Sequence, residues 1–365
     1  MKDNKAKKYN RIKLWFGIGK GIATFLLILA FVMSGLSELL VNYLSGFIEN
    51  QYLLFIIFSA VSGLAASVLF FPVNFYTEFI LEHKYELSNQ TFGKWIREDL
   101  KGALVGGVIG LPVLLVFFYS LNKFGSLWWL PFAVILFLFS VILARIVPVW
   151  IMPLFYKITP VENDELRERI LTLSVDAGLK VENVFRFDMS KNTKKANAAF
   201  TGLGKTKRIL LGDTLLDGYD NDEIETVIAH ELGHYKRKHI VKNIIISTVS
   251  SFLVFFLIAY FYEISIAWFG FSEITQIAAL PLLTLWAMLL GLIQSPLSNM
   301  LSRKFEYEAD TYAVASTKKK EAFIRTLDKL NDQNLGDKDP HPFVEWFFYS
   351  HPSVKKRIEF INSLK

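Results

Sequence analysis

Two histidines and a glutamate stand close together in the stretch TVIAHELGHYKRKH, residues 226–239. His230 and His234 are four residues apart, and Glu231 directly follows the first histidine. Residues four apart lie on one face of a helix, so both imidazoles could reach a single metal ion. Glu231 would then lie beside the open metal position and could take a proton from bound water. The pattern predicts a zinc-dependent hydrolytic site, although a solvated helix with two incidental histidines would have the same spacing.

The residues around this motif favour a helix. Asp220 or Asn221 is expected to be the N-cap, and Glu223 stands three residues after Asp220, as in a capping box. Acidic residues fill the first turn and basic residues, 236–238, fill the last, as the helix macrodipole favours. His239 follows in the same basic stretch and is interpreted as a capping residue at the C-terminus of the helix.

A catalytic zinc takes a third protein ligand, and the segment SRKFEYEADTYAVA, residues 302–315, offers one. Glu306 would complete a two-histidine, one-glutamate site, and Asp310, one helical turn later, would orient a ligand histidine through its free ring nitrogen. Glu308 is expected on another face, in contact with solvent. The separation from the second histidine, 306 − 234 = 72 residues, is long for a compact soluble zinc protease. Two membrane spans would fill it and return the chain to the starting side.

The elements that must position these residues follow from an apolar composition. The chain has 365 residues, of which 52% are hydrophobic. Each of its charge-poor runs is close to the roughly 20 apolar residues that a helix needs to cross a bilayer. These runs fall near 14–35, 52–76, 102–121, 126–147, 243–262 and 276–300. The sequence therefore predicts a polytopic protein with about six spans in a lipid bilayer; the first run is too long for a signal-peptide core.

The charged residues and the lack of cysteine exclude several kinds of site and partner and indicate the orientation in the membrane. Without cysteine, disulfides, thiolate ligands and a cysteine nucleophile are excluded. The net charge is +6, but no basic patch interleaved with aromatic residues occurs, so no nucleic-acid partner is expected. The basic N-terminus and the basic loop 77–101 are placed on the cytoplasmic side, because the opposite loops contain a single basic residue, Lys123.

Five segments occur in an order that is specific to one family. They are SNQTFGKWIREDLKG, ANAAFTGLGKTKRILLGDTLL, HELGHYKRKH, LSRKFEYEADTYA and YSHPSVKKRI. With them the chain resembles the integral-membrane zinc proteases of the CAAX prenyl protease 1 (Ste24-like) type, peptidase family M48. The resemblance implies one Zn²⁺ per chain, held by His230, His234 and Glu306, with Glu231 as the general base.

The resemblance also implies residues that handle the substrate. Asn197 and Ala198 would lie on an edge strand that binds the substrate backbone by strand addition. His351 and Arg357 would be catalytic residues near the metal, where His351, and Arg357 with it, would meet the developing oxyanion. Read alone, Asn197 is an ordinary turn residue, His351 a loop residue before a helix, and Arg357 a solvated charge.

The expected fold is mainly α, a polytopic helical membrane protein with a cytoplasmic-side α+β metalloprotease domain of the gluzincin type, split by a transmembrane hairpin. Residues 1–149 would form an N-terminal membrane region with about four spans, and 241–300 the hairpin. Residues 150–240 and 301–365 would form the two parts of the protease domain.

Within the first part of that domain, three local patterns are expected. Residues 162–179 have helical spacing, whereas VENVFRFD, 181–188, and RILLGDTLL, 208–216, have the composition of strands. The stretch TGLGKTK, residues 201–207, would be the turn between strand segments.

Three functions remain open at this point. The first is CAAX-type cleavage near the C-terminus of prenylated proteins or peptides, and the second is general quality control of membrane proteins. The third is a non-enzymatic transporter or scaffold with a structural metal, but Glu231 argues against it because a structural site needs no adjacent base. The expected location is the bacterial inner membrane, or the endoplasmic reticulum in a eukaryote. The oligomeric state is left open.

Overall fold

Six helical stretches are long and apolar enough to cross a membrane within the part of the chain that the computed structural model describes, residues 2–179, 183–201 and 208–364. Their most apolar windows have mean hydropathies of 2.0 to 2.6, and at most 33% of any window is buried. Most of these apolar side chains therefore face outwards, as a lipid environment requires. The stretches are Asn4–Met33, Gln51–Lys84, Phe92–Leu127, Trp129–Phe155, His239–Phe269 and Ile277–Thr317. The prediction of about six spans is confirmed.

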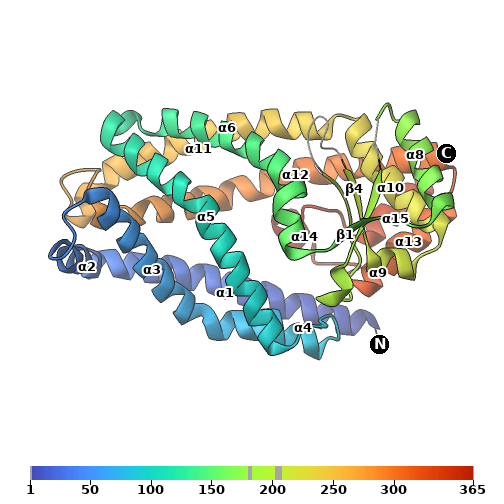
Figure 1. The fold of residues 1–365 in the computed structure, drawn as a ribbon, viewed down its shortest axis with the longest axis horizontal. Coiled ribbons are helices and arrows are strands. Elements are labelled where there is room, and N and C mark those ends of the chain that lie inside the picture. The colour runs from blue at the N-terminus through green and yellow to red at the C-terminus, as the bar shows by residue number, and fades with distance from the viewer. Residues whose placement is uncertain (1, 180–182, 202–207, 365) are drawn as a thin grey trace.

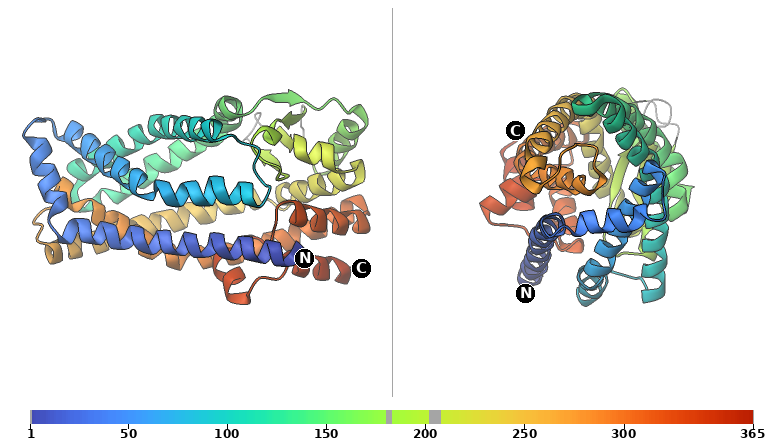
Figure 2. Two further views of the ribbon diagram at one scale, coloured as in Figure 1. Left: turned by 90° about the horizontal axis from the view of Figure 1, so that it is seen from below. Right: turned by 90° about the vertical axis from the view of Figure 1, so that its left-hand side faces the viewer.

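The long helices form a closed ring, which is visible when the molecule is viewed along its long axis (Figure 2). Each helix packs against the next, and the last packs against the first. In ring order they are α1 (Lys2–Met33), α3 (Gln51–Asn74), α5 (Phe92–Phe124), α6 (Trp129–Ile146), α11 (His239–Ser265) and α12 (Pro281–Thr317). The short helix α2, Leu36–Ser45, contacts α1 and α3 at the end of the ring remote from both chain termini (Figure 1).

Two of the candidate spans contain a π-helical turn near their C-terminal end. The α3 helix passes through a π-helical turn, Phe75–Ile80, into α4, Leu81–Lys84. The α6 helix passes through a second π-helical turn, Val147–Ile151, into α7, Met152–Phe155.

A small mixed sheet lies at the end of the molecule where both termini are found (Figure 1). Its order is β1-β2-β4-β3, in which β2 and β4 are parallel and the two outer pairings are antiparallel. The strands are β1 (Ile158–Pro160), β2 (Val184–Phe187), β3 (Ala198–Thr201) and β4 (Arg208–Gly212). In this order β3 is an edge strand.

The expected strands are found, with one correction. β2 lies within 181–188 as predicted, but the strand expected over 208–216 stops at Gly212, and Asp213–Gly218 is the helix α9. The Asp213 carboxylate accepts hydrogen bonds from the backbone N–H groups of Thr214 and Ser190, which ties the chain back at the point where the strand ends. The turn expected at 201–207 lies outside the described residues, except that Thr201 belongs to β3.

Four further helices share one hydrophobic core with this sheet: α8 (Asp164–Asp176), α10 (Asn221–Lys236), α13 (Lys320–Gln333) and α15 (Val354–Ser363). A fifth, α14 (Pro342–Phe348), packs against α12. The core includes Ile170 of α8, Leu211 of β4 and Ile228 of α10 together with Phe323 of α13 and Ile361 of α15, all at most 1% exposed. Segments before and after the membrane hairpin thus bury their apolar surfaces against each other.

Candidate metal centre

The helix that carries the two histidines begins with a complete capping box. The Asp220 side chain accepts a hydrogen bond from the Glu223 backbone N–H at 2.8 Å, and the Glu223 carboxylate accepts one from the Asp220 N–H at 3.1 Å. Two unpaired N–H groups at the helix start are satisfied in this way, which fixes where α10 begins. The predicted start at Asp220 is confirmed, and the fixed helix places His230 and His234 one turn apart on the same face.

A glycine allows this helix to approach α12 closely. A Cβ atom at Gly233 would lie 2.9 Å from the Ala309 Cα and 3.1 Å from the Tyr312 Cβ. Any larger residue would therefore force α10 and α12 apart. Since Gly233 lies between the two histidines and Ala309 lies within one turn of Glu306, the contact brings the ligand side chains of the two helices together.

Three side chains from these helices converge on one point. The His230 and His234 Nε2 atoms are 3.2 Å apart, and each lies 3.3 Å from a different oxygen of the Glu306 carboxylate. Atoms bound to zinc at about 2.0–2.1 Å in a tetrahedral arrangement lie roughly 3.4 Å from each other. His230, His234 and Glu306 therefore have the spacing of a preformed metal site.

The surroundings of Glu306 also fit a metal. Its side chain is only 5% exposed, and its Oε2 atom accepts no hydrogen bond from any residue that the structure describes. A buried carboxylate oxygen without a partner costs free energy, and a cation bound between the carboxylate and the two imidazoles would remove that cost. Two imidazoles and one carboxylate are donors that suit zinc.

The other ring nitrogen of His230 is held by a buried ion pair. The His230 Nδ1 atom lies 2.8 Å from an oxygen of Asp310, and the Arg357 Nε donates to the other oxygen of Asp310 at 2.9 Å. Burial lowers the pKa of His230, but the adjacent carboxylates of Asp310 and Glu306 outweigh it and raise the pKa to about 9 in the metal-free protein. The same contacts orient the imidazole so that its Nε2 faces the other two ligands.

Two further predicted residues lie beside the metal group. Glu231 is half-buried, and its charge is close enough to Arg357 to contribute to raising the pKa of that guanidinium. The His351 Nε2 lies 3.4 Å from the Glu306 carboxylate, and its side chain is 64% exposed. His351 therefore reaches the site from its open side. Arg357 lies on the buried side, where its Nη1 atom is 3.6 Å from Glu306.

The edge strand has an open side. The Gly212 N–H donates to the Asn197 carbonyl at 2.9 Å, and the register pairs Ala198 with Leu211. In an antiparallel ladder, hydrogen-bonded and non-hydrogen-bonded pairs alternate, so the backbone N–H and C=O of Ala198 and Phe200 point away from β4. β3 also contacts α10, the helix of the metal group. Asn197 itself precedes the strand by one residue.

Glu308 and His239 differ from their predicted roles. Glu308 was expected to be solvated, but its side chain is 30% exposed and lies 3.0 Å from the His239 Nε2. His239 was expected to cap α10, but that helix ends at Lys236, and His239 is the first residue of α11. Lys238 between the helices has a φ of 57°, in the left-handed region, and this break redirects the chain. Neither the break nor its direction has a sequence signal, because lysine rarely adopts such a conformation.

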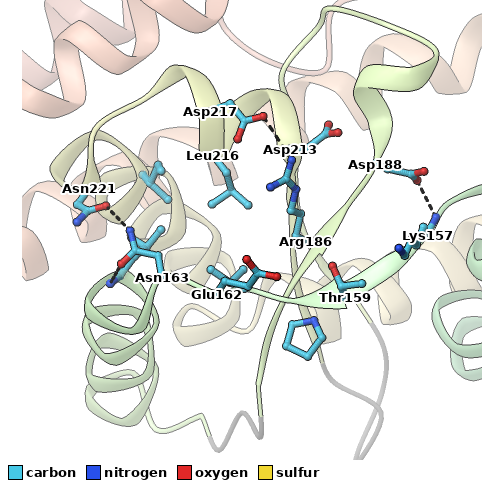
Figure 3. A pocket seen from close by; sticks show the side chains of 14 residues that line it. Lys157, Thr159, Glu162, Asn163, Arg186, Asp188, Asp213, Leu216, Asp217 and Asn221 are labelled. Atoms are coloured by element: carbon cyan, nitrogen blue, oxygen red, sulfur yellow. Dashed lines mark hydrogen bonds and ion pairs between the residues drawn. The ribbon is translucent and has the colours of Figure 1, made fainter.

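A cavity of about 420 Å³ lies elsewhere, beside β1 and the start of α8 (Figure 3). Two contacts are made among its lining residues: Arg186 lies 3.4 Å from Asp217, and the Lys157 backbone N–H donates to Asp188 at 2.6 Å. None of the residues of the metal group lines it. The cavity is therefore separate from the metal group.

These observations indicate a multi-pass membrane protein in which two histidines of α10 and a glutamate of the last candidate span could hold a metal ion. Residues 160–365 match Peptidase family M48, and residues 2–157 match the family described as "CAAX prenyl protease N-terminal, five membrane helices". The chain belongs to peptidase family M48 and is a membrane metalloprotease. Within the second match, the described residues contain four candidate spans.

Several relatives are similar over most of their length. The "Uncharacterized metalloprotease YhfN" of Bacillus subtilis is 31% identical over 359 residues, which cover 97% of this chain and 84% of the relative. The CAAX prenyl protease 1 of Saccharomyces cerevisiae is 34% identical over 307 residues, 79% of this chain and 67% of that protein. The crystal structure of S. mikatae Ste24p superposes with a TM-score of 0.87 at 29% identity and covers 99% of this chain and 89% of that one.

Proposed function

We propose that this protein is a zinc metalloendopeptidase that cleaves near the C-terminus of prenylated proteins or peptides. One observation carries the proposal: His230, His234 and Glu306 converge to mutual distances of 3.2 to 3.3 Å although 72 residues (306 − 234) separate the last two in the sequence. Relatives over most of the chain are named CAAX prenyl protease 1, which supports this class of substrate.

His230, His234 and Glu306 would hold the zinc, which when bound lowers the pKa of water to about 7 and polarises the scissile carbonyl. Glu231 follows His230 on the same helix and makes no hydrogen bond with another described residue, so its carboxylate is available as a base. It would accept the proton of the attacking water and deliver it to the leaving amine. His351, on the exposed side, would donate to the oxyanion as it forms.

Asp310 and Arg357 would hold the ligand His230 in position from the buried side of the metal group. The Arg357 guanidinium makes two hydrogen bonds to Asp310, which in turn contacts His230 Nδ1. Its donors are thus largely used within the protein, which supports a role in fixing Asp310 and His230 and leaves the oxyanion to His351. The bidentate geometry suits arginine and not lysine.

The substrate backbone would extend the sheet at β3. Asn197 and Ala198 begin the edge segment, and the outward backbone groups of Ala198 and Phe200 are the ones that an added strand would pair with. Because β3 contacts α10, an added strand would run past the metal group.

We propose the same division into a protease domain and a membrane region that the sequence predicts. Residues 150–240 and 301–365 would form one protease domain, which the common core of residues from α8, α10, α13 and α15 supports. Residues 1–149 and the hairpin 241–300 would form the membrane region. The basic N-terminus favours a cytoplasmic location of the protease domain, since both termini lie at its end of the molecule.

Paired measurements on Glu231→Gln test this function. The variant should bind about one zinc per chain, like the wild type, but should lose most turnover because only the base is removed. Glu168→Gln, the same change on the exposed surface of α8, serves as the control and should keep full activity. A wild-type protein that stays fully active after removal of zinc with 1,10-phenanthroline would contradict the proposal.

The substrate class needs a second comparison. A farnesylated C-terminal peptide and its unmodified form, offered at equal concentration, should be cleaved at clearly different rates, with the prenylated peptide preferred. Equal rates on both, together with cleavage of unrelated membrane peptides, would support general membrane proteolysis and reject the prenylated class.

A further inference from the structure

His234 has a second contact that differs in kind from that of His230. Its Nδ1 atom lies 3.0 Å from the Nδ1 atom of His239, and the Nε2 atom of His239 lies 3.0 Å from a carboxylate oxygen of Glu308. The three side chains come from α10, from the first residue of the membrane helix α11 and from α12. His239 is 1% exposed, so water does not compete for its ring nitrogens.

Metal binding determines the proton position in all three groups. The His234 Nε2 faces the other ligands, and a ligand nitrogen must carry no proton, so the proton of the neutral ring lies on Nδ1. This N–H can donate to His239 only if the His239 Nδ1 is an acceptor. The His239 proton then lies on Nε2, where it donates to Glu308. The donors all point away from the metal, and the chain ends on a carboxylate.

The central ring of this chain is held in place by packing. The His239 ring is stacked on Phe305 with a centroid distance of 4.1 Å and an interplanar angle of 8°. Lys242, one turn along α11, lies 3.7 Å from the same Glu308 oxygen that His239 contacts. The imidazole therefore cannot turn without losing both the ring contact and its hydrogen bonds.

We infer that His239 and Glu308 are positioning residues that fix the tautomer and ring orientation of the metal ligand His234. The inference rests on the proposed metal site. His234 reaches a carboxylate through a relay, the hydrogen-bonded chain His234–His239–Glu308. His230, in contrast, contacts the carboxylate of Asp310 directly. Because His239 begins the first helix of the membrane hairpin, the relay ties the orientation of one ligand to the placement of that hairpin against α10 and α12.

Metal affinity is the readout that tests this inference, measured by competition against a fluorescent zinc chelator in the detergent-solubilised full chain. His239→Phe keeps a flat ring against Phe305 but removes both nitrogens, and Glu308→Ala removes the terminal acceptor. Each should weaken zinc binding by about 10–100-fold, the usual effect of losing a contact behind a ligand histidine. Glu308→Gln retains an acceptor oxygen and should recover most of the affinity.

Glu168→Ala is the matched control, because it removes the same kind of side chain from the exposed surface of α8, where it does not contact the relay. It should bind zinc like the wild type. Cobalt(II)-loaded protein gives a second readout, since the visible absorption of Glu308→Ala should shift while that of Glu168→Ala should not. Wild-type affinity in both His239→Phe and Glu308→Ala would overturn the inference and leave the metal site intact. A wild-type chain that binds no zinc would overturn the metal site itself.

Discussion

Gly233 of α10 and Ala309 of α12 are in backbone contact: a Cβ at Gly233 would lie 2.9 Å from the Ala309 Cα and 3.0 Å from the Ala309 carbonyl oxygen. The atoms in the way belong to the main chain, which cannot move aside as the end of a flexible side chain can. The distance between the two helices therefore depends on the absence of one methyl group, and the three metal ligands depend on that distance.

Gly233→Ala should separate α10 from α12. Overpacking of this kind costs about 1–3 kcal/mol, so we expect lower thermal stability and weaker zinc binding in the same variant. Gly218→Ala is the control, because a Cβ at Gly218 meets nothing within 4 Å. Zinc titration and thermal unfolding in detergent check both variants, and unchanged zinc affinity in Gly233→Ala would show that the ligands tolerate a wider helix spacing.

Asp310→Asn should weaken the contact that fixes the orientation of the His230 imidazole. The amide keeps the shape of the carboxylate but loses its charge, so its hold on the His230 Nδ1–H and on Arg357 weakens. We expect zinc affinity to fall about 10-fold, the lower end of the effect of losing such a contact. Asp164→Asn on the exposed start of α8 is the control, and its affinity should equal that of the wild type. Equal affinities in both variants would reject the orienting role of Asp310.

Asp310→Ala should have a second effect, on the fold. It would leave the buried guanidinium of Arg357 without its carboxylate, and breaking a buried pair in this way costs about 3–5 kcal/mol. The free energy of unfolding of the metal-free protein should therefore fall well below that of Asp310→Asn. Combining Asp310→Ala with Arg357→Met should recover part of the loss, and no recovery would indicate that the pair is not the cause.

Ala198→Pro should weaken the binding of substrate and leave the stability of the fold unchanged. The Ala198 N–H points away from β4, so proline there removes a group that an added strand would use, and no hydrogen bond of the sheet. We expect kcat/KM to fall by about 10-fold or more, which corresponds to roughly 1.4 kcal/mol, at unchanged zinc content. Ala199→Pro removes an N–H that faces β4 and should lower thermal stability instead. If the two variants behaved alike, the open side of β3 would not be the binding edge.

Residues at the two ends of the membrane helix α11 should be accessible to a labelling reagent from opposite sides of the membrane. The chain has no cysteine, so Asp164→Cys, at the exposed start of α8, and Ser272→Cys, in the exposed segment between α11 and α12, can each be labelled without background. A membrane-impermeant maleimide added to sealed vesicles of one orientation should react with one of them only. Reaction of both from the same side would contradict the prediction that α11 crosses the membrane.

The sequence predicted those features that arise from neighbouring residues. Apolar runs of sufficient length define the membrane helices, and the Asp220–Glu223 capping box defines the start of α10. The spacing of His230 and His234 places both on one face, because the helix period is a local property of the backbone. The segment 302–315 offered Glu306 as the third ligand, because two membrane spans return it to the side of the histidines, and the resemblance to a known family implied the same residue.

The tertiary structure decided what depends on contacts between distant segments. The sequence misjudged Glu308 because its partner, His239, is turned towards it by the left-handed residue Lys238, and no local pattern announces such a break. The strand expected over 208–216 ended early because Asp213 bonds to Ser190, a residue 23 positions away. Local propensities vary by less than about 1 kcal/mol per residue, so burial and hydrogen bonding between distant segments determine the outcome wherever the two disagree.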